Sequence, residues 1–373
     1  MYAMTTFEEL YLKALKEATG KDGFSYDPGQ LDCLFDPQKQ PLGWNPDEVF
    51  LADGLPKNGQ TLSKDTKAVL DALQENKNRP AFILIAPAFL GQFSDQVTAG
   101  MMRTAFKKIG FDGLLEVAVF ADILTLREAL EFDQNIHTQS DFQITSCCCP
   151  MWLAMIKKLY SQLIPHVPAT VSPMIAAGRA VKYLHPDALT VFVGPCVAKK
   201  AEAREKDIAG AVDYVLTFQE TKELFELLQV DLLQMEDKIK EFSSEAGRIY
   251  ARTGGVSEAV KNTLERLHPG RDITIHSQQA DGVPACKEMI NDLLEGKTRA
   301  NFFEGMGCVG GCVGGPKALI AKEAAREKVN HYGQKAAYKT PLDNPYVLEL
   351  LYRLNFTTLD SLLEDNEFFT RTL

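Results

Sequence analysis

The sequence of 373 residues lacks any long apolar run. A membrane-spanning helix needs about 18 or more consecutive apolar residues, whereas the longest apolar stretches here, such as Ala81–Ala88, have the length of a strand. The first residues also lack the basic end and the apolar core of a secretory signal peptide. We therefore expect a cytoplasmic protein with no membrane partner.

An excess of positive charge is also missing. The chain has 40 Lys and Arg residues against 50 Asp and Glu residues, which gives a formal net charge of −10. Sequence-independent binding to nucleic acid depends on cationic side chains that neutralise phosphates. The charge balance therefore argues against a nucleic-acid partner.

Strand-like and helix-like segments alternate along most of the chain. This alternation predicts an α/β fold with two lobes, in which twisted and mostly parallel sheets are flanked by helices. Thr217 and Glu220 also predict a capping box at the start of one helix. Strands are expected at 81–86, 116–120, 142–145, 189–193, 213–216 and 272–276. Helices are expected at 1–20, 62–74, 94–108, 124–132, 150–162, 217–229, 256–267 and 287–294.

The same pattern suggests a division of the chain into four parts. An N-terminal helix and a wrapping segment form 1–61, because 21–61 is rich in Asp, Pro, Gly and Gln. The first α/β lobe is expected at 62–180 and the second at 181–340, and C-terminal helices at 341–373.

Cysteine usage is the most unusual feature of the composition. Disulfides are rare in the cytosol, and adjacent cysteines pair poorly because disulfide geometry needs separated Cα atoms. Clustered cysteines in a cytosolic protein point to metal or redox chemistry instead. The eight cysteines lie at 33, 147, 148, 149, 196, 286, 308 and 312.

Three cysteine-bearing segments follow predicted strands or lie in glycine-rich turns, and ligands bind at such sheet edges in α/β folds. Cys308 and Cys312 are four residues apart, so a turning segment puts both thiolates on one side. The glycines around them leave amide N–H groups free to bond to sulfur, which suits an iron–sulfur cluster. The segments are Thr145-Ser-Cys-Cys-Cys-Pro-Met-Trp152, Gly194-Pro-Cys-Val-Ala-Lys-Lys-Ala-Glu202 and Glu304-Gly-Met-Gly-Cys-Val-Gly-Gly-Cys-Val-Gly-Gly-Pro316.

A 4Fe–4S cube needs four thiolates, which Cys308, Cys312, Cys196 and one member of the triplet would supply. A radical-SAM site needs a third cysteine three residues after Cys312, where Gly315 stands. A zinc site favours a closer cysteine pair and fewer glycines. The cube therefore fits the spacing better than either alternative.

The three segments resemble the active-site signatures of the FeFe-hydrogenases, which read T-S-C-C-P-x-W, P-C-x2-K-K-x-E and E-x-M-x-C-x2-G-C-x2-G-G. Weaker similarity runs from about residue 80 to 355, so the resemblance covers most of the chain. It extends to the catalytic domain only, because Cys33 alone precedes the triplet and accessory ferredoxin-like domains need more cysteines. The weaker matches are Ala86-Pro-Ala88, Ala121-Asp122, Thr253-Gly-Gly-Val256 and Asn344-Pro345.

The resemblance implies an H-cluster in the cleft between the lobes. In this cofactor a 4Fe–4S cube shares one cysteine with a diiron unit that carries CO, CN⁻ and an azadithiolate. The matched positions make Cys149, Cys196 and Cys308 ligands of the cube. Cys312 is implied as the ligand that bridges the cube and the diiron unit.

The resemblance also assigns roles around the diiron unit. Cys148 matches the cysteine that carries protons to the open iron site, Lys199 matches a lysine that contacts a cyanide, and Met306 matches a methionine near the bridging carbonyl. A lysine beside a cyanide forms a charge-assisted hydrogen bond, which is short and strong. Four further residues are expected to contact the cofactor: Pro87, Ala88, Ser172 and Pro195.

The family's proton path continues through a glutamate, a serine and a second glutamate. An ungapped alignment from Ala121-Asp122 puts Glu128 and Glu131 at the glutamate positions, on one face of a helix. The alternative is that both are solvated surface glutamates. The serine position falls on Pro168, which cannot relay a proton, so water or another route must replace that step.

Other departures lie close to the expected cofactor. Gly194 replaces a common methionine, Ala88 replaces a serine, and Cys147 is an additional cysteine with either a packing or a redox, oxygen-protective role. Such changes around a metal site tune its reactivity. The pattern resembles divergent sensory branches of the family, which implies slow turnover or hydrogen sensing.

We therefore predict an iron–sulfur oxidoreductase that interconverts H2 with protons and electrons, or that senses H2 with the same site. The resemblance implies an external ferredoxin-like electron carrier or subunit, and maturation proteins that supply the diiron unit. One alternative is an iron–sulfur assembly protein of the Narf-like group, which shares cysteine signatures without the diiron unit. Another is a structural or electron-transfer cluster protein.

Overall fold

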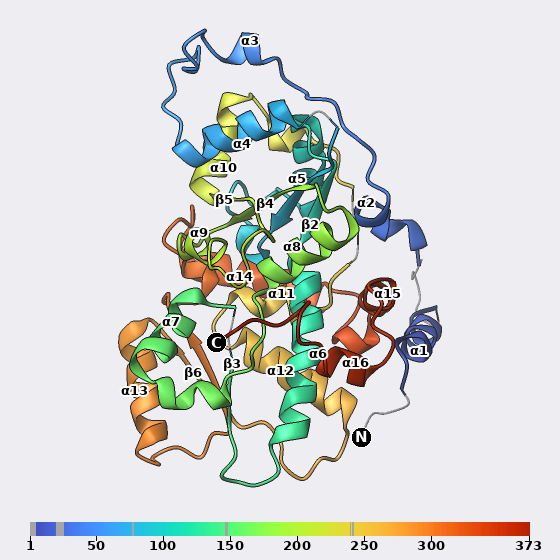
Figure 1. The fold of residues 1–373 in the computed structure, drawn as a ribbon, viewed down its shortest axis with the longest axis vertical. Coiled ribbons are helices and arrows are strands. Elements are labelled where there is room, and N and C mark those ends of the chain that lie inside the picture. The colour runs from blue at the N-terminus through green and yellow to red at the C-terminus, as the bar shows by residue number, and fades with distance from the viewer. Residues whose placement is uncertain (1–4, 20–25, 77, 146–147, 239, 241) are drawn as a thin grey trace.

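The computed structural model describes residues 5–19, 26–76, 78–145, 148–238, 240 and 242–373. Two parallel sheets form its framework, and helices flank both (Figure 1). The predicted α/β class with parallel sheets is confirmed, since every pairing between named strands is parallel. In the described residues, no helix combines the length and the apolar character needed to cross a lipid bilayer.

The first sheet has the strand order β2-β1-β4-β5. Its strands are buried on both faces, as parallel sheets covered by helices are. Phe82 and Leu84 face one core together with α8, whereas Ile83 and Ile85 face a second core with α4, α5 and α10. The strands are β1 (Ala81–Ile85), β2 (Gly113–Glu116), β4 (Leu189–Gly194) and β5 (Tyr214–Thr217), and the helices are α4 (Lys64–Glu75), α5 (Ala99–Ile109), α8 (Pro173–Leu184) and α10 (Phe218–Leu227).

The second sheet has the order β3-β7-β6. Phe302 of β7 packs into a core with α6 and α12, and Phe303 packs on the opposite face with α7 and α13. The strands are β3 (Gln143–Thr145), β6 (Ser277–Asp281) and β7 (Phe302–Met306), and the helices are α6 (Ala118–Asn135), α7 (Pro150–Leu159), α12 (Gly255–Leu267) and α13 (Val283–Leu294).

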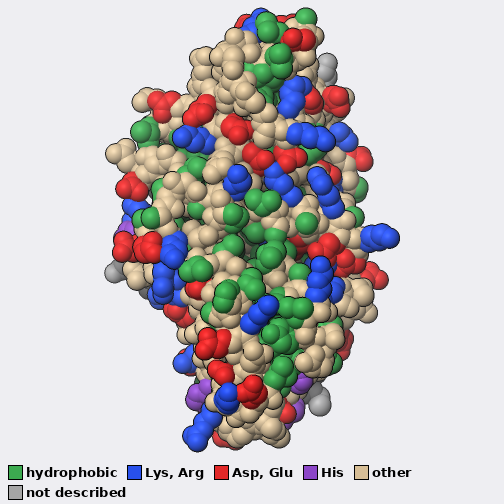
Figure 2. Space-filling model, turned by 90° about the vertical axis from the view of Figure 1, so that its left-hand side faces the viewer, with side chains coloured by type: hydrophobic (Ala, Val, Ile, Leu, Met, Phe, Trp, Pro, Cys, Tyr) green, Lys and Arg blue, Asp and Glu red, His purple; other side chains and the backbone are tan. Residues whose placement is uncertain are grey.

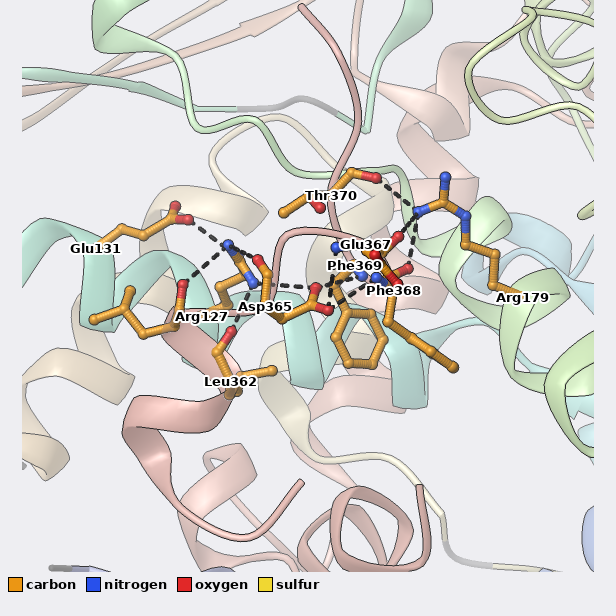
Figure 3. A network of polar contacts seen from close by, with 10 residues as sticks. Arg127, Glu131, Arg179, Leu362, Asp365, Glu367, Phe368, Phe369 and Thr370 are labelled. Atoms are coloured by element: carbon orange, nitrogen blue, oxygen red, sulfur yellow. Dashed lines mark hydrogen bonds and ion pairs between the residues drawn. The ribbon is translucent and has the colours of Figure 1, made fainter. Parts of the chain in front are cut away.

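The C-terminal segment packs beside α6 and α8, and the N-terminal helix packs on that segment. Helix α1 packs on α15. Arg127 of α6 donates to the Leu362 carbonyl, and Arg179 of α8 donates to the carbonyls of Glu367, Phe368 and Thr370 (Figure 3). The terminal helices are α1 (Phe7–Thr19), α15 (Pro345–Arg353) and α16 (Leu359–Leu363).

Shorter elements connect these units, including those in the segment 21–61. They are η1 (Pro28–Leu31), α2 (Asp32–Phe35), α3 (Pro46–Val49), η2 (Pro87–Phe89), η3 (Ser161–His166), α9 (Ala198–Glu202), η4 (Leu232–Gln234), α11 (Glu245–Arg248), η5 (Ile249–Ala251), η6 (Cys312–Gly314) and η7 (Pro341–Asp343). One further long helix, α14 (Lys322–Gln334), packs on α11 and on the short turns η5 and η6.

Two predicted strands are wrong. The run 116–120 is the end of β2 and the start of α6, a helix that is buried on nearly all sides and therefore shows no amphipathic period. The run 272–276 precedes β6, whose own sequence is polar and gives no apolar signal. Helix α5 also begins five residues later than expected, because Thr98 caps it through the Met101 N–H.

The two sheets do not divide the chain in halves. Strands β1 and β2 pair with β4 and β5 from the far side of residue 180, while β3 pairs with β7. An expected boundary near 180 therefore does not separate the sheets. The four-part division remains a prediction about independently folding units.

Candidate metal centre

The first cysteine segment follows β3 and leads into α7. Cys149 is the N-cap of α7, and Pro150 occupies its first turn, where a missing N–H costs nothing. Trp152 of the same helix donates a hydrogen bond of 2.8 Å to the carbonyl of Thr145 and closes the loop. Ser146 and Cys147 lie outside the described residues, so the prediction for Cys147 is not tested.

The third segment follows β7, the neighbour of β3, which brings the two segments together. A β-carbon at Gly305 would lie 2.3 Å from the Trp152 ring, so only glycine allows this close packing. The backbone N–H of Gly307 donates to the Cys149 sulfur over 3.3 Å. The glycine-rich sequence predicts such hydrogen bonds from backbone N–H groups to cysteine sulfur atoms.

The second segment comes from the other sheet. Strand β4 ends at Gly194, and Pro195, Cys196 and the short helix α9 follow. Helix α9 contacts α7, and the Pro195 ring packs against Gly315, where a β-carbon would come within 2.8 Å. The three segments therefore meet between the two sheets, at carboxyl ends of their strands, as expected.

The thiols of Cys149, Cys196, Cys308 and Cys312 lie close enough to affect one another. Burial, followed by the charges of the neighbouring thiols, raises the pKa of Cys308 to about 11 and also raises that of Cys312. Without a metal, the Cys308 and Cys312 thiols therefore hold their protons near neutral pH, and a bound metal must displace these protons.

The spacing of these thiols does not suit a single ion. Among the described residues, no three Cys, His, Asp or Glu side chains converge closely enough to hold one metal ion. A cube holds its four cysteines farther apart than one zinc ion does. The four thiols lie close together, and a backbone N–H donates a hydrogen bond to one of their sulfur atoms. This arrangement fits an iron–sulfur cube.

A cavity adjoins the thiols on the side of Cys148 and Cys312. Its lining residues are apolar or aromatic except for three cysteines, Tyr250 and Lys199. The walls combine the turns that follow β1 and β4 with the start of α8. The lining residues are Ala86, Pro87, Val117, Ala121, Cys148, Pro173, Met174, Phe192, Pro195, Cys196, Lys199, Tyr250, Ala251 and Cys312.

Lys199 is buried and tied to two segments. Its ammonium group donates to the Cys148 carbonyl over 2.9 Å and forms a 2.6 Å ion pair with Glu202. Burial opposes its charge, but the Glu202 carboxylate outweighs this effect and raises the pKa of Lys199. The ammonium group is therefore charged at the edge of an otherwise apolar cavity.

Three expected cofactor contacts lie near this cavity but outside its lining. Ala88 is buried one residue beyond Pro87, and Met306 is buried in a cluster that includes Cys148. Ser172 directly precedes the lining residue Pro173, and within the described structure its buried hydroxyl has no hydrogen-bond partner. An unsatisfied buried hydroxyl beside the cavity fits a site that holds a polar ligand.

The two glutamates of the expected proton path differ in burial. Glu128 is buried and accepts a hydrogen bond from the Thr145 hydroxyl, and its charge raises the pKa of Cys148 after burial and neighbouring thiols. Glu131 is partly buried, and Arg127 donates to it over 3.0 Å. The surface-residue alternative is therefore wrong for Glu128, whereas Glu131 is partly buried and borders a surface cleft. The role of both stays a prediction.

Pro168 and Glu131 line one surface cleft, which His166 and Gln143 also border. Pro168 and Glu131, which the alignment places at two positions of the family's proton path, are therefore neighbours in space. The cleft lies at the Glu131 end of the Glu128–Glu131 face, where a replacement for the missing serine would have to act.

Sequence reasoning missed Arg127 and Tyr250. Arg127 joins Glu131 to the C-terminal segment by further bonds to Asp365 (Figure 3), and its spacing of four residues from Glu131 was the only available signal. Tyr250 precedes the Thr253-Gly-Gly-Val256 match by three residues, and nothing in the local pattern points toward the cavity.

Comparison with protein families matches residues 79–316 to the model described as "Iron only hydrogenase large subunit, C-terminal domain". Iron hydrogenase 1 of Clostridium pasteurianum is 27% identical over 67% of this chain and 52% of its own length. Protein NAR1 of Arabidopsis thaliana is 25% identical over 64% of this chain and 63% of its own length. The chain thus spans about half to three-fifths of these relatives.

Solved structures share the fold. A single-residue variant of HydA1 from Chlamydomonas reinhardtii, described as an [FeFe]-hydrogenase, superposes with a TM-score of 0.65 and 20% identity. The match covers 78% of this chain and 94% of that one. At this identity the similarity establishes the two-sheet architecture alone.

Proposed function

The chain belongs to the iron-only hydrogenase large-subunit family, and on that premise we propose that it interconverts H2 with protons and electrons. The proposed cofactor is a 4Fe–4S cube held by Cys149, Cys196, Cys308 and Cys312, with a CO-, CN⁻- and azadithiolate-bearing diiron unit joined through Cys312. When bound, this group supplies the site at which H2 is made or split.

One observation carries the proposal. The cavity beside Cys312 has an apolar lining with a buried thiol, Cys148, and a buried cation, Lys199. A cube bound to the four thiols would leave this space empty. An apolar cavity with one fixed positive charge suits a group that carries anionic ligands and must be kept from water.

The residues of the chain have separate tasks in this proposal. Lys199 holds and orients the cofactor by its charge, while Pro87, Ala88, Ser172, Pro195 and Met306 shape its surroundings. The Cys148 thiol moves a proton between the cavity and Glu128, which accepts a bond from Thr145. Glu131 lies one helical turn farther along and borders the surface cleft, so it is placed to exchange protons with solvent.

The implied partners are H2, protons, a ferredoxin-like electron carrier and maturation proteins that insert the diiron unit. A slow, hydrogen-sensing role is consistent with Gly194 and Ala88, which replace a methionine and a serine common in the family. These substitutions change the immediate surroundings of the cofactor, and such surroundings tune a metal group.

A second candidate function is iron–sulfur cluster assembly. It is favoured by the match to NAR1 proteins at nearly the same identity as the match to hydrogenases. In that case the cube would bind and the cavity beside Cys312 would hold no diiron unit.

The experiment is anaerobic reconstitution with iron and sulfide, followed by a synthetic diiron mimic. The measurement is H2 release from protons, with reduced methyl viologen as the electron donor. We expect H2 release that depends on the mimic. Protein with a complete cube that does not take up the mimic and neither releases nor consumes H2 would favour the assembly function.

A further inference from the structure

Strand β3 follows helix α6 after a short connection in which the chain turns back (Figure 1). On β3, Gln143 and Thr145 are two residues apart and therefore point to the same face of the sheet. Phe302, which pairs with Gln143, packs on this face against Phe132 of α6. The intervening Ile144 packs in the core on the opposite face. Gln143 and Thr145 therefore both face α6.

Two pairs of polar residues meet between β3 and α6. In the first pair, the Thr145 hydroxyl donates a hydrogen bond to the Glu128 carboxylate. Gln143 lies two residues before Thr145, a step of about 6.7 Å on a strand. Glu131 lies three residues after Glu128, a step of about 4.5 Å on a helix. Gln143 therefore comes opposite Glu131, and both side chains line the same cleft.

The second pair has one unsatisfied atom on each side. Gln143 is 4% exposed, and its Nε2 atom has no hydrogen-bond partner among the described residues. One carboxylate oxygen of Glu131 accepts from Arg127 over 3.0 Å, whereas the buried Oε2 atom has no partner in the same part of the chain. A buried donor and a buried acceptor are unfavourable when unpaired. Together they mark a place for a third group that bonds to both.

A water molecule suits this place. The cleft has a volume of about 490 Å³, and half of its lining residues have polar side chains. Buried water typically makes about three hydrogen bonds to polar groups that would otherwise be unsatisfied. A water between the two side chains can accept a hydrogen bond from the Gln143 amide and donate one to the Glu131 carboxylate.

We propose that Gln143 is a positioning residue that holds a water molecule against Glu131, and that this water performs the proton step that Pro168 cannot perform. The inference rests on the proposed function and adds a residue to its proton path. An O–H bond of the Glu128 carboxyl breaks as one forms to the water. A different O–H bond of the water breaks as one forms to Glu131, so the water is regenerated. The reverse sequence carries a proton inward.

The surroundings of Glu131 suit this exchange. Burial raises the pKa of Glu131, and the Arg127 guanidinium opposes this effect. A raised pKa brings a carboxyl closer to the pH at which it both takes up and releases protons. Pro168 lines the same cleft, so the position of the missing serine borders the space that the water would occupy.

The side of the molecule that carries α7 and α13 is a less suitable exit for protons. Hydrophobic side chains gather over its middle, and charged side chains surround them (Figure 2). Protons move along polar side chains and water. The cleft at the end of α6 has His166 and Asp141 on its lining besides Gln143 and Glu131, and its polar character favours it as the exit.

The first test is a high-resolution crystal structure of the full chain without the diiron unit. A water should lie within about 2.7–3.2 Å of both Gln143 Nε2 and Glu131 Oε2. In Gln143→Met, which has a side chain of similar size without a donor, this water should be absent. A parent structure with no water in contact with both atoms would overturn the proposal.

The second test compares H2 release by the loaded protein in H2O and in D2O. Gln143→Met should lower the rate about tenfold, which is less than the 10²-fold expected for a group that itself transfers the proton. It should also raise the solvent isotope effect, because proton transfer then limits more of the rate. Iron content and the CO and CN⁻ infrared bands should stay at the parent level.

Gln162→Met is the matched control, because Gln162 is exposed and lies outside the lining of the cleft. It should keep the parent rate and isotope effect. Equal rates in Gln143→Met and the parent would overturn the proposal. A lower rate with an unchanged isotope effect would also overturn it, since Gln143 would then support the fold alone.

Failure of the proposed function has a different signature. In that case the parent protein would release no H2, although its crystal structure would still show the bridging water. The proton step would then fall together with the function that it serves.

Discussion

The Lys199 ammonium group donates a 2.9 Å hydrogen bond to the carbonyl oxygen of Cys148. The bond joins the second signature, which follows a strand of one sheet, to the first signature, which follows a strand of the other. Both residues also line the cavity beside Cys312. A single buried cation thus fixes the two halves of the proposed cofactor site relative to one another.

Removal of this cation should destabilise the fold. In Lys199→Met, Glu202 would remain buried without its partner, and breaking a buried pair in this way costs about 3–5 kcal/mol. The measurement is urea unfolding of the cofactor-free protein. Lys199→Met combined with Glu202→Leu should recover most of the loss, and a double variant no more stable than the single one would contradict the account.

Cys148→Ser should leave the cube and the diiron unit in place but lower H2 turnover by about 10²-fold, a typical effect of losing a group that transfers protons. A hydroxyl has nearly the same shape but gives up its proton far less readily. The comparison is Cys33→Ser, a half-buried thiol outside the site, which should turn over like the parent. Equal rates in Cys148→Ser would remove the relay role.

Glu128→Gln should slow turnover while the bond from Thr145 is kept, because an amide oxygen still accepts it. The expected loss is again about 10²-fold, with unchanged iron content. Glu226→Gln, an exposed glutamate on α10, serves as the control. If both variants match the parent, Glu128 has a structural role only.

Asp122 gives a prediction about pH. Burial raises the pKa of Asp122 to about 7, although Ser244 and Gly247 donate hydrogen bonds to it. The folded protein therefore keeps this proton between pH ~4 and ~7, where the unfolded chain releases it. Linkage then makes the parent lose stability, relative to Asp122→Asn, as pH rises through this window.

The total change should be a few kcal/mol, and it should level off above about pH 7. Urea unfolding of both cofactor-free proteins at pH 5, 6, 7 and 8 measures it. A parent that gains stability relative to Asp122→Asn with rising pH would show that the hydrogen bonds, rather than burial, control this carboxyl.

The parts of the fold that were predictable have local signals. The apolar runs of β1 and β4 have strand length, and Thr217 with Glu220 forms the expected capping box. The three cysteine segments meet because each follows a strand whose carboxyl end faces the space between the sheets. Their convergence could therefore be expected from the order of strands and turns.

Other features depend on contacts that no local pattern reveals. The α6 helix is buried on nearly all sides, so the apolar sequence at its start resembles that of a strand. Polar β6 is held by its pairing with β7 rather than by its own composition. Which strands share a sheet across residue 180 is likewise a property of tertiary packing.

The site shows the same division. The identity of the cysteines and of Lys199 was visible in the motifs, whereas the burial of Glu128 and the Arg127–Glu131 pair follows from packing around α6. The meeting of Gln143 with Glu131 at one cleft could not be foreseen, since it depends on how β3 packs along α6.

The most direct test of the central claim is an infrared spectrum of the anaerobically reconstituted protein, loaded with the diiron mimic, in the CO and CN⁻ stretching region. The account predicts sharp protein-bound bands that shift under H2 and are absent in Cys312→Ala. A spectrum without such bands, from protein whose cube is visible by paramagnetic resonance, would contradict the diiron site and support an assembly function.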